Sequence, residues 1–371
     1  MTLRGAAETS PAAAEGDAVQ ATPVPTSGLA PAAPTSDFHA TAPELPRALV
    51  AGRYRVRSYL NEGATSYVYL ADDLEAKTSV VLKVLKPEAA GRPELRQCIE
   101  RETRAAAALA HPNIVRVLSG GETEEGLPFV VMEAEEAEPL DGVLRRYGKV
   151  APELVLLVAQ QAGAALAAAH AAGIVHRDVK PGNLLVIGTP ETPRGVKLLD
   201  FGMAKLADEK EDPETSIVLG TIEYMAPEQI VVESVDARAD VYALGVLLFR
   251  LATGHLPFDT AAGPIVLRHQ LFSPLPPPSW LDEQIDPRLE AIILNATRKH
   301  PDNRYPSMES LLEDLSAVLD GSERPVATRT LRRVPDAYEP RTERGREALE
   351  ILSRTFGPYA SVPGPRATPD E

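Results

Sequence analysis

The sequence predicts an α+β fold in which a small β-rich part is followed by a larger α-rich part. Three observations lead to this prediction. Apolar periodicity is sustained only between about residues 53 and 320. The first third of that range is rich in strand-forming runs, and the remainder is dominated by helical patterns. A domain of this length buries about three quarters of its unfolded surface, which is enough for a stable core.

The β-rich part covers about residues 53–133. Its short runs are rich in β-branched and aromatic residues and are separated by turn-forming or polar segments, which is the pattern of strands. One helix-forming stretch interrupts them at 93–109. We therefore expect strands, one helix and again strands. The expected strands are 54–60, 67–71, 79–85, 114–118 and 129–133.

The α-rich part covers about residues 138–320, after an acidic connector. We expect helices at 152–172, 240–252, 286–298 and 307–319, and a lengthened hairpin at 188–195. The run 155–175 is apolar enough to raise the question of a membrane span. Gln160, Gln161 and His170 interrupt it, so we expect a buried scaffold helix.

The segments on either side of the domain are expected to carry little core. Residues 1–52 are rich in Ala and Pro, so they offer little apolar surface to offset the entropy of ordering. We expect a disordered arm there. Residues 321–371 are also rich in Pro, and we expect a mostly disordered tail with one short helix at 341–356, where helix formers and apolar spacing permit it.

Composition limits the classes of partner and the compartment. The 371 residues carry a net charge of −15, which argues against an electrostatic grip on nucleic acid or on anionic lipid. Cys98 is the only cysteine, which excludes an intrachain disulfide and a multi-cysteine zinc site. Because no secretion signal follows the N-terminus, we expect a cytoplasmic protein with neither a nucleic-acid nor a membrane partner.

Two motifs carry the chemistry. The stretch HRDVKPGN at 176–183 places a carboxylate, an ammonium and an amide within six positions, at Asp178, Lys180 and Asn183. Seventeen residues after Asn183 comes Asp200, which opens the sequence DFG. In this order and spacing the two motifs resemble the eukaryotic-type protein kinase family. The stretches at 111–115, 176–183 and 225–229 resemble its bacterial serine/threonine branch.

This resemblance implies a two-lobed protein kinase fold, with a small β-rich N-lobe that holds one key helix and a larger α-rich C-lobe. It also implies ATP as substrate and Mg²⁺ as cofactor. Asp178 would accept or orient the substrate hydroxyl, and Lys180 would contact the γ-phosphate. Asn183 and Asp200 would supply oxygen ligands to Mg²⁺. Lys83, in the sequence VVLK, would bind the α- and β-phosphates.

The same resemblance assigns the remaining nucleotide contacts. Glu102 stands where the family keeps the helix glutamate that pairs with Lys83. Gly63 is the one glycine that matches the three of the family's phosphate-covering loop, which puts nucleotide affinity in question. The residues assigned to the adenine slot are Leu60 and Val68 as roof, Val81 beside the ring, Leu185 as floor, Met132 as gatekeeper, and Glu133 to Glu135 as hinge.

Further positions follow from the resemblance for regulation and for the scaffold. Thr215 and Ser216 are candidate phosphorylation sites in the activation segment, and a phosphate there could pair with Arg177. Thr221 would belong to the substrate-docking loop. The residues given structural roles are His176 as an anchor of the catalytic loop, Asp240 as a support for its backbone, and Glu228 with Arg304 as a pair.

Three functions remain open at the level of sequence. The first is a kinase that phosphorylates Ser or Thr on proteins and on itself. The second is a pseudokinase or scaffold that binds nucleotide weakly, as the glycine-poor loop and Val81 suggest. The third is a small-molecule phosphotransferase. The presence of Lys83, Asp178, Asn183 and Asp200 together favours the first.

Overall fold

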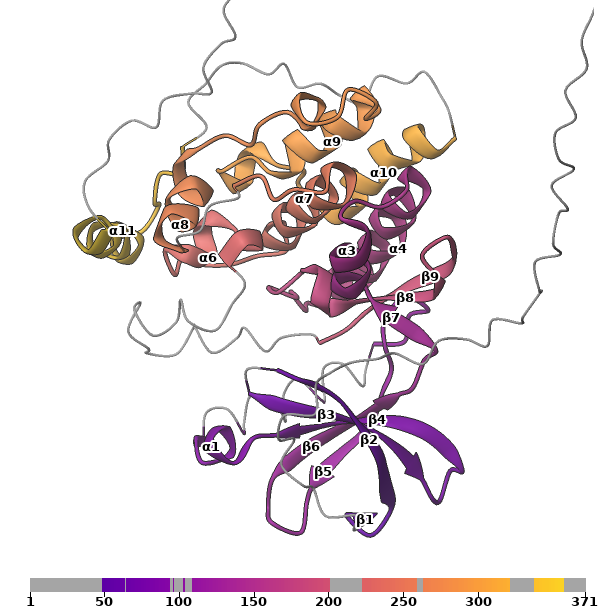
Figure 1. The fold of residues 1–371 in the computed structure, drawn as a ribbon. Helices are drawn as coiled ribbons and strands as arrows, with labels where there is room; N and C mark the ends of the chain where they lie inside the picture. The colour runs from indigo at the N-terminus through magenta and orange to yellow at the C-terminus, as the bar shows by residue number, and fades with distance from the viewer. Residues whose placement is uncertain are drawn as a thin grey trace, which may run out of the picture. The chain divides into compact units, whose positions relative to one another are not determined.

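The computed structural model describes residues 49–63, 65–93, 96, 103, 109–200, 222–258, 263–320 and 337–356, all of which fall in one compact unit, Leu45–Glu371. Within these residues the expected α+β fold is confirmed: an N-terminal antiparallel sheet precedes a helical C-terminal region (Figure 1). The helix expected at 93–109 falls largely outside the described residues.

The N-terminal sheet has six strands in the order β1-β2-β3-β4-β6-β5. Alternating side chains of its central strands form a small core that includes Ala71, Val80, Leu82 and Val131. A short helix, α1 (Pro87–Ala90), follows β4. The strands are β1 (Leu49–Val50), β2 (Tyr54–Glu62), β3 (Ser66–Asp73), β4 (Thr78–Leu85), β5 (Val117–Glu122) and β6 (Pro128–Glu133).

One strand begins later than the sequence predicted. The run 114–118 was expected to be a strand, but β5 starts at Val117 and continues through two glycines to Glu122. The first residues of the run pair elsewhere: Ile114 bridges to Leu198, and the amide of Val115 donates to the Leu198 carbonyl at 2.9 Å. The β-branched side chains of this run predicted a strand, and its first residues do pair, but their partner is β9 of the C-terminal region.

A second, three-stranded sheet contains β7 (Ala137–Pro139), β8 (Leu184–Thr189) and β9 (Thr192–Leu198). The expected lengthened hairpin is the continuation of β8 and β9 up to a tight turn at Thr189 and Thr192. Because Leu184 pairs with Leu198, this hairpin brings Asn183, just before β8, close to Asp200, just after β9.

Helices build the rest of the C-terminal region around one large core (Figure 1). The helix α7 lies at its centre. A Cβ added at Gly245 of α7 would lie 2.7 Å from Thr297 Cγ2 and 2.8 Å from Ala296 Cβ, so glycine at this position allows α7 and α9 to pack closely. The helices are α3 (Leu140–Tyr147), α4 (Pro152–Ala171), α6 (Pro227–Ile230), α7 (Arg238–Thr253), α8 (Gly263–Phe272), α9 (Pro287–Ala296) and α10 (Met308–Leu319).

Among the described helices, α4 alone is long and apolar enough to cross a membrane by length and composition. Leu154, Val158 and Leu166 on this helix are buried in the large core. It is therefore the core helix of the C-terminal region, as expected from the polar residues that interrupt its sequence.

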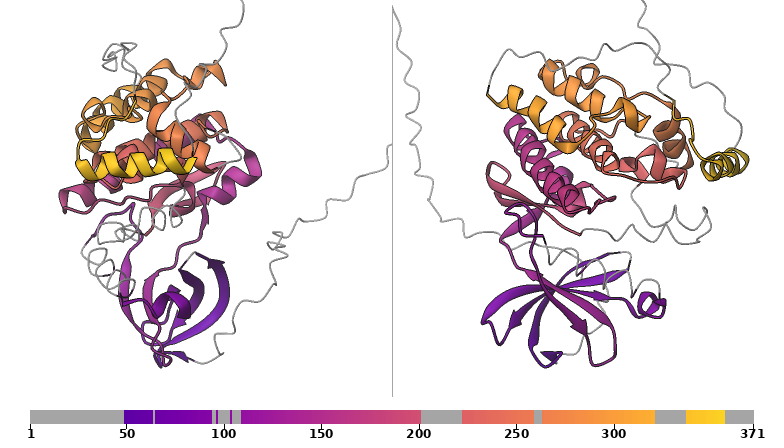
Figure 2. Two further views of the ribbon diagram at one scale, coloured as in Figure 1. Left: turned by 90° about the vertical axis from the view of Figure 1, so that its left-hand side faces the viewer. Right: turned by 180° about the vertical axis from the view of Figure 1, so that it is seen from behind.

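Part of the segment after residue 320 is packed against the C-terminal region. The helix α11 (Glu343–Phe356) lies beside α6 and α8 in all three views (Figures 1 and 2). Tyr338, Ala348 and Leu352 are buried in a cluster that they share with those helices. Composition did not predict this packing, because the segment contains few apolar residues and contributes only one face of a core.

Candidate active site

An ion pair joins the N-terminal sheet to a residue that closely follows the second sheet. Lys83 projects from β4, and its Nζ lies 2.8 Å from Oδ1 of Asp200, which follows β9. Burial opposes ionisation of Asp200, but the nearby Lys83 ammonium outweighs it, with help from His176 and Lys180, and holds the pKa of Asp200 below its ordinary value. Asp200 is therefore ionised at neutral pH.

The loop at 176–183 brings three polar side chains into direct contact. Lys180 Nζ lies 2.7 Å from Asp178 Oδ2, and Asn183 Nδ2 donates to the same oxygen at 2.9 Å. Asn183 Nδ2 also donates to the Asp178 carbonyl at 2.7 Å. Both bonds use the amide nitrogen, so Oδ1 of Asn183 is the atom that can ligate a cation.

Asp240 at the start of α7 supports this loop from beneath. Its fully buried carboxylate accepts from the backbone amides of His176 and Arg177, each at 2.8 Å. It also contacts His170 Nε2 of α4 at 2.7 Å. Arg177 has a φ of 67°, which is strained for a non-glycine residue, and the bond to Asp240 helps to hold it there.

His176 is a scaffold residue with a defined tautomer. Its Nε2 lies 2.7 Å from the Leu199 carbonyl, which can only accept, so Nε2 carries the proton. Its Nδ1 then accepts from the Asp178 amide at 3.2 Å. One buried ring thus connects the backbone beside Asp178 to the residue that precedes Asp200, and it fixes the spacing of the two motifs.

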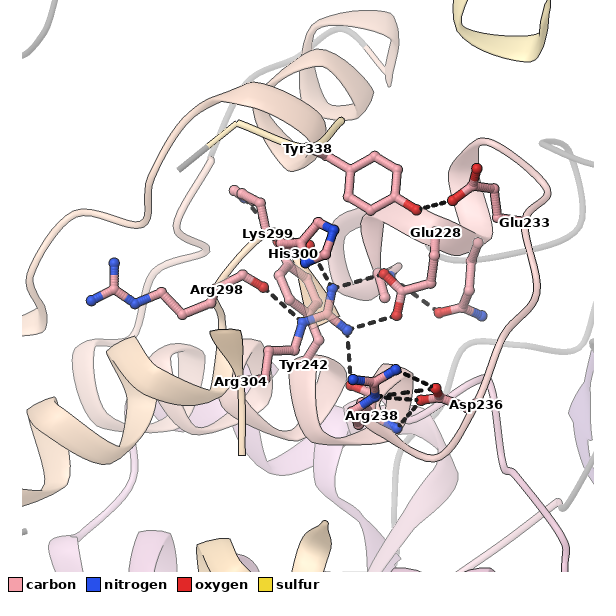
Figure 3. Close-up of polar contacts among 12 residues, drawn as sticks. Glu228, Glu233, Asp236, Arg238, Tyr242, Arg298, Lys299, His300, Arg304 and Tyr338 are labelled. Carbon is pink, nitrogen blue, oxygen red and sulfur yellow. Dashed lines mark hydrogen bonds and ion pairs between the residues drawn. The ribbon is translucent and has the colours of Figure 1, made fainter. Parts of the chain in front are cut away.

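A buried ion pair anchors the chain that follows the activation segment (Figure 3). Arg304 donates to both carboxylate oxygens of Glu228, at 2.6 and 2.7 Å. The next residue, Gln229, donates through Nε2 to the Arg177 carbonyl at 2.8 Å. The segment around Glu228 is therefore joined directly to the loop that carries Asp178.

The apolar residues assigned to the adenine slot come from the N-terminal sheet and from β8 of the second sheet. Val81 and Met132 pair in register on β4 and β6, and Leu185 of β8 belongs to the same apolar cluster. Val68 pairs in register with Lys83. Leu60 is half exposed on β2, so its side chain is open to a ligand. The two sheets therefore both contribute apolar side chains beside the Lys83–Asp200 pair.

Lys197 on β9 holds the acidic residues assigned to the hinge. Its Nζ lies 2.6 Å from Oε1 of Glu133 and also contacts Glu135. Burial opposes the charge of Lys197, but the two carboxylates outweigh it and raise its pKa. The carboxylates of Glu133 and Glu135 are thus paired within the protein, and the Glu133 amide donates to the Arg116 carbonyl at 3.0 Å.

Gly63 directly follows β2, and its amide donates to the Ser66 carbonyl at 2.8 Å. An added Cβ there would lie 3.6 Å from that carbonyl oxygen, which is ordinary contact. Beside it, Glu62 pairs with Lys86 at 2.5 Å. The hairpin is closed by these bonds, and the absence of the two other glycines does not prevent it from forming.

The oxygen donors present fit a magnesium nucleotide. No group of three or more His, Cys, Asp and Glu within the described residues could hold a metal by itself. Mg²⁺ with a nucleotide needs only one or two protein oxygens, because phosphate and water supply the rest. Asn183 Oδ1 and the ionised Asp200 carboxylate are such a pair, brought together by the β8–β9 hairpin.

Comparison with known proteins decides the family. Residues 54–331 match the model of the protein kinase domain. This chain belongs to the protein kinase family. It is 38% identical over 276 residues to serine/threonine-protein kinase pkn3 of Myxococcus xanthus, covering 72% of this chain and 50% of the relative. It is 38% identical over 275 residues to serine/threonine-protein kinase PknB of Mycobacterium leprae, covering 72% of this chain and 43% of the relative.

The family is also seen in the fold. The crystal structure of the M. tuberculosis PknI kinase domain matches with a TM-score of 0.59 and 28% identity, covering 74% of this chain and 98% of that one. The chain spans about half the length of the curated relatives it matches. Proteins of the protein kinase family transfer the γ-phosphoryl group of ATP.

Not every predicted site residue of the kinase can be placed. Glu102, Thr215, Ser216 and Thr221 lie outside the described residues. Conversely, the sequence analysis missed three residues that support the site: His170, Lys197 and Gln229. Each is a common polar residue outside the two motifs. The signal that could have identified them is that they lie on elements next to the catalytic loop or the hinge.

Proposed function

We propose that this chain is a serine/threonine protein kinase that transfers the γ-phosphoryl group of ATP to protein hydroxyls, including its own. The Lys83–Asp200 contact carries the proposal, because it brings the phosphate-binding cation and a metal-binding carboxylate from two sheets to one point. Asn183 is bonded to Asp178, and the β8–β9 hairpin places Asn183 close to Asp200.

The reaction divides the work among these side chains. Lys83 binds the α- and β-phosphate oxygens, which replace the Asp200 carboxylate as its partner. Asn183 and Asp200 would hold Mg²⁺, which would neutralise charge on the phosphate oxygens. Lys180 donates to the γ-phosphate.

Asp178 orients the substrate hydroxyl and accepts its proton as the new O–P bond forms and the bond to the ADP oxygen breaks. Position 180 is two residues after Asp178, and a lysine there is typical of Ser/Thr acceptors by resemblance. Arg177 would pair with a phosphate on Thr215 or Ser216 and so order the activation segment.

The test is transfer of labelled phosphate from ATP with Mg²⁺, to the chain itself and to a generic basic protein. We expect transfer by the wild type, loss of transfer in Lys83→Met and Asp178→Asn, and loss on adding EDTA. Lys149→Met is the matched control, because Lys149 is exposed and its ion pair with Asp282 lies on the surface.

Equal labelling in all variants would contradict the proposal and would indicate a contaminating kinase. Nucleotide binding without transfer would favour the pseudokinase, which the single matching glycine of the phosphate-covering loop also suggests. Transfer to a small alcohol and not to protein would favour the third candidate function.

A further inference from the structure

A segment near the C-terminal end crosses the outer side of α6 and α8 (Figures 1 and 2). We call residues 337–352 the strap. Ala348 and Leu352 of the strap pack with Ile230, Leu267 and Leu271 of the kinase domain in one buried cluster. The Tyr338 amide also donates to the Leu271 carbonyl at 2.8 Å. The strap is thus an integral part of this surface.

Glu233 is the polar centre of the contact. Its buried carboxylate accepts from the Tyr338 hydroxyl, from the Thr342 amide at 2.7 Å and from the Thr342 hydroxyl at 3.0 Å. Burial opposes the charge, but these donors outweigh it and lower the pKa of Glu233. All of these side-chain and amide donors belong to the strap, so Glu233 is buried and charged only because the strap is docked.

Close packing restricts the sequence of the strap at one position. A Cβ added at Gly345 would lie 2.8 Å from Cδ of Glu233 and closer still to Oε1. Since the carboxylate is held by three donors, it cannot move aside without breaking bonds. Glycine is therefore required for docking at position 345, although its backbone angle is ordinary.

The surface under the strap holds the loop at 222–225. The side chain of Gln270, on α8, donates to the Glu223 carbonyl, and Ile222 and Met225 pack against the buried cluster that contains the strap. Four residues further on, Gln229 bonds to the Arg177 carbonyl beside Asp178. The chain segment that begins with the loop at 222–225 is therefore supported by α8 and the strap at one end and bonded to the loop that carries Asp178 at the other.

The turn between Gln229 and Glu233 is under strain. Val232 has a φ of 54°, in the left-handed region that is unfavourable for a β-branched residue. It is held between the Glu228–Arg304 pair on one side and the Glu233 carboxylate on the other. Release of the strap would free one end of this turn.

We propose that the strap is a positioning element for protein substrates: it fixes α8, the loop at 222–225 and the turn at 229–233. The inference rests on the proposed kinase function. None of the strap contacts described above involves Lys83, Asp200 or the adenine slot. The strap therefore acts on binding of the protein substrate and leaves binding of ATP unchanged.

The experiment compares Gly345→Ala and Tyr338→Phe with the wild type in steady-state phosphorylation of a basic protein. Gly345→Ala removes no hydrogen-bond donor and acts only by expelling the strap. We expect KM for the protein substrate to rise roughly ten- to hundredfold in Tyr338→Phe, which is the factor that corresponds to the loss of one bond to a charged group. The rise should be at least as large in Gly345→Ala, because expulsion of the strap breaks all three bonds to Glu233. KM for ATP should stay within about twofold.

Tyr305→Phe is the matched control. Tyr305 is also a buried tyrosine that donates to a carboxylate, Asp314, at 2.8 Å, but it lies outside the strap cluster. We expect it to lower the melting temperature without changing KM for the protein substrate. A strap variant that only lowers the melting temperature, or that changes both KM values equally, would overturn the proposal, as would a variant with increased activity.

A second measurement separates this inference from the proposed function. Amide hydrogen exchange reports the strap contacts whether or not the chain transfers phosphate. In Gly345→Ala we expect faster exchange at 222–225 and at 266–272, with exchange at 79–85 unchanged. Unchanged exchange at 222–225 would contradict the positioning role. If the wild type transfers no phosphate but the exchange changes as expected, the kinase function fails and the structural link remains.

Discussion

Replacement of Arg304 by methionine should cost more stability than any other single change to a charged residue described above. Arg304 is fully buried, and its guanidinium makes two bonds to Glu228 and further bonds to three backbone carbonyls (Figure 3). Methionine fills much of the same space but donates nothing. The Glu228 carboxylate would then be buried and charged without its partner.

The magnitude follows from that burial. Removal of one partner of a buried ion pair costs about 3–5 kcal/mol, because the remaining charge stays desolvated. For a domain of this size, each kcal/mol lowers the melting temperature by about 2–4 °C, so we expect a decrease of about 6–20 °C. Arg288→Met is the matched control: its pair with Asp286 is about one third exposed on both sides and should contribute about 0–1 kcal/mol.

Urea denaturation followed by circular dichroism measures the free energy of unfolding of both variants. A second substitution, Glu228→Leu, should restore part of the stability of Arg304→Met, because it removes the unpaired charge. A loss below about 1 kcal/mol in Arg304→Met, or no recovery in the double variant, would refute the reasoning.

Three other outcomes follow from single contacts. Arg53 holds the pKa of Asp73 at about 2 by donating to its carboxylate, against the effect of burial and with support from the amides of Ala76 and Glu75. The stability that Asp73 adds relative to Asp73→Asn should therefore be complete above about pH 4 and should disappear as pH falls toward 2, as measured by urea denaturation across that range. Gly245→Ala forces a methyl group against Thr297 and Ala296 and should lower the free energy of unfolding by about 1–3 kcal/mol in the same assay. An unchanged urea midpoint would show that α7 and α9 can separate freely. Asp178→Asn should lower the rate of phosphoryl transfer about 10²- to 10⁴-fold with little change in KM for ATP, and a variant with wild-type turnover would exclude Asp178 as the base.

The elements that sequence reasoning predicted are those whose signal is local. The catalytic loop was recognised because Asp178, Lys180 and Asn183 are separated by only a few residues, and the structure brings these three together. The strands of the N-terminal sheet were predicted because β-branched residues concentrate within each one. The start of β5 was misplaced, because a β-branched run shows that residues pair but not which strand they pair with.

The parts that were missed depend on contacts between distant residues. His170 lies 70 positions from Asp240, whose supporting role was predicted, and Tyr338 lies 105 positions from Glu233. A tyrosine in a proline-rich segment has no periodicity to mark it as buried. Only the fold shows that it lies on a surface prepared by α6 and α8, and that the carboxylate opposite needs its hydroxyl.

The most direct measurement of the shared phosphate site is a double-mutant cycle on the affinity for ATP with Mg²⁺. Lys83→Met, Asp200→Asn and the double variant are compared with the wild type by calorimetry. Because both side chains act on one metal-bound triphosphate, we expect each single variant to lose most of the affinity and the double variant to lose little more. Losses that simply add would place Lys83 and Asp200 in separate sites and contradict the account.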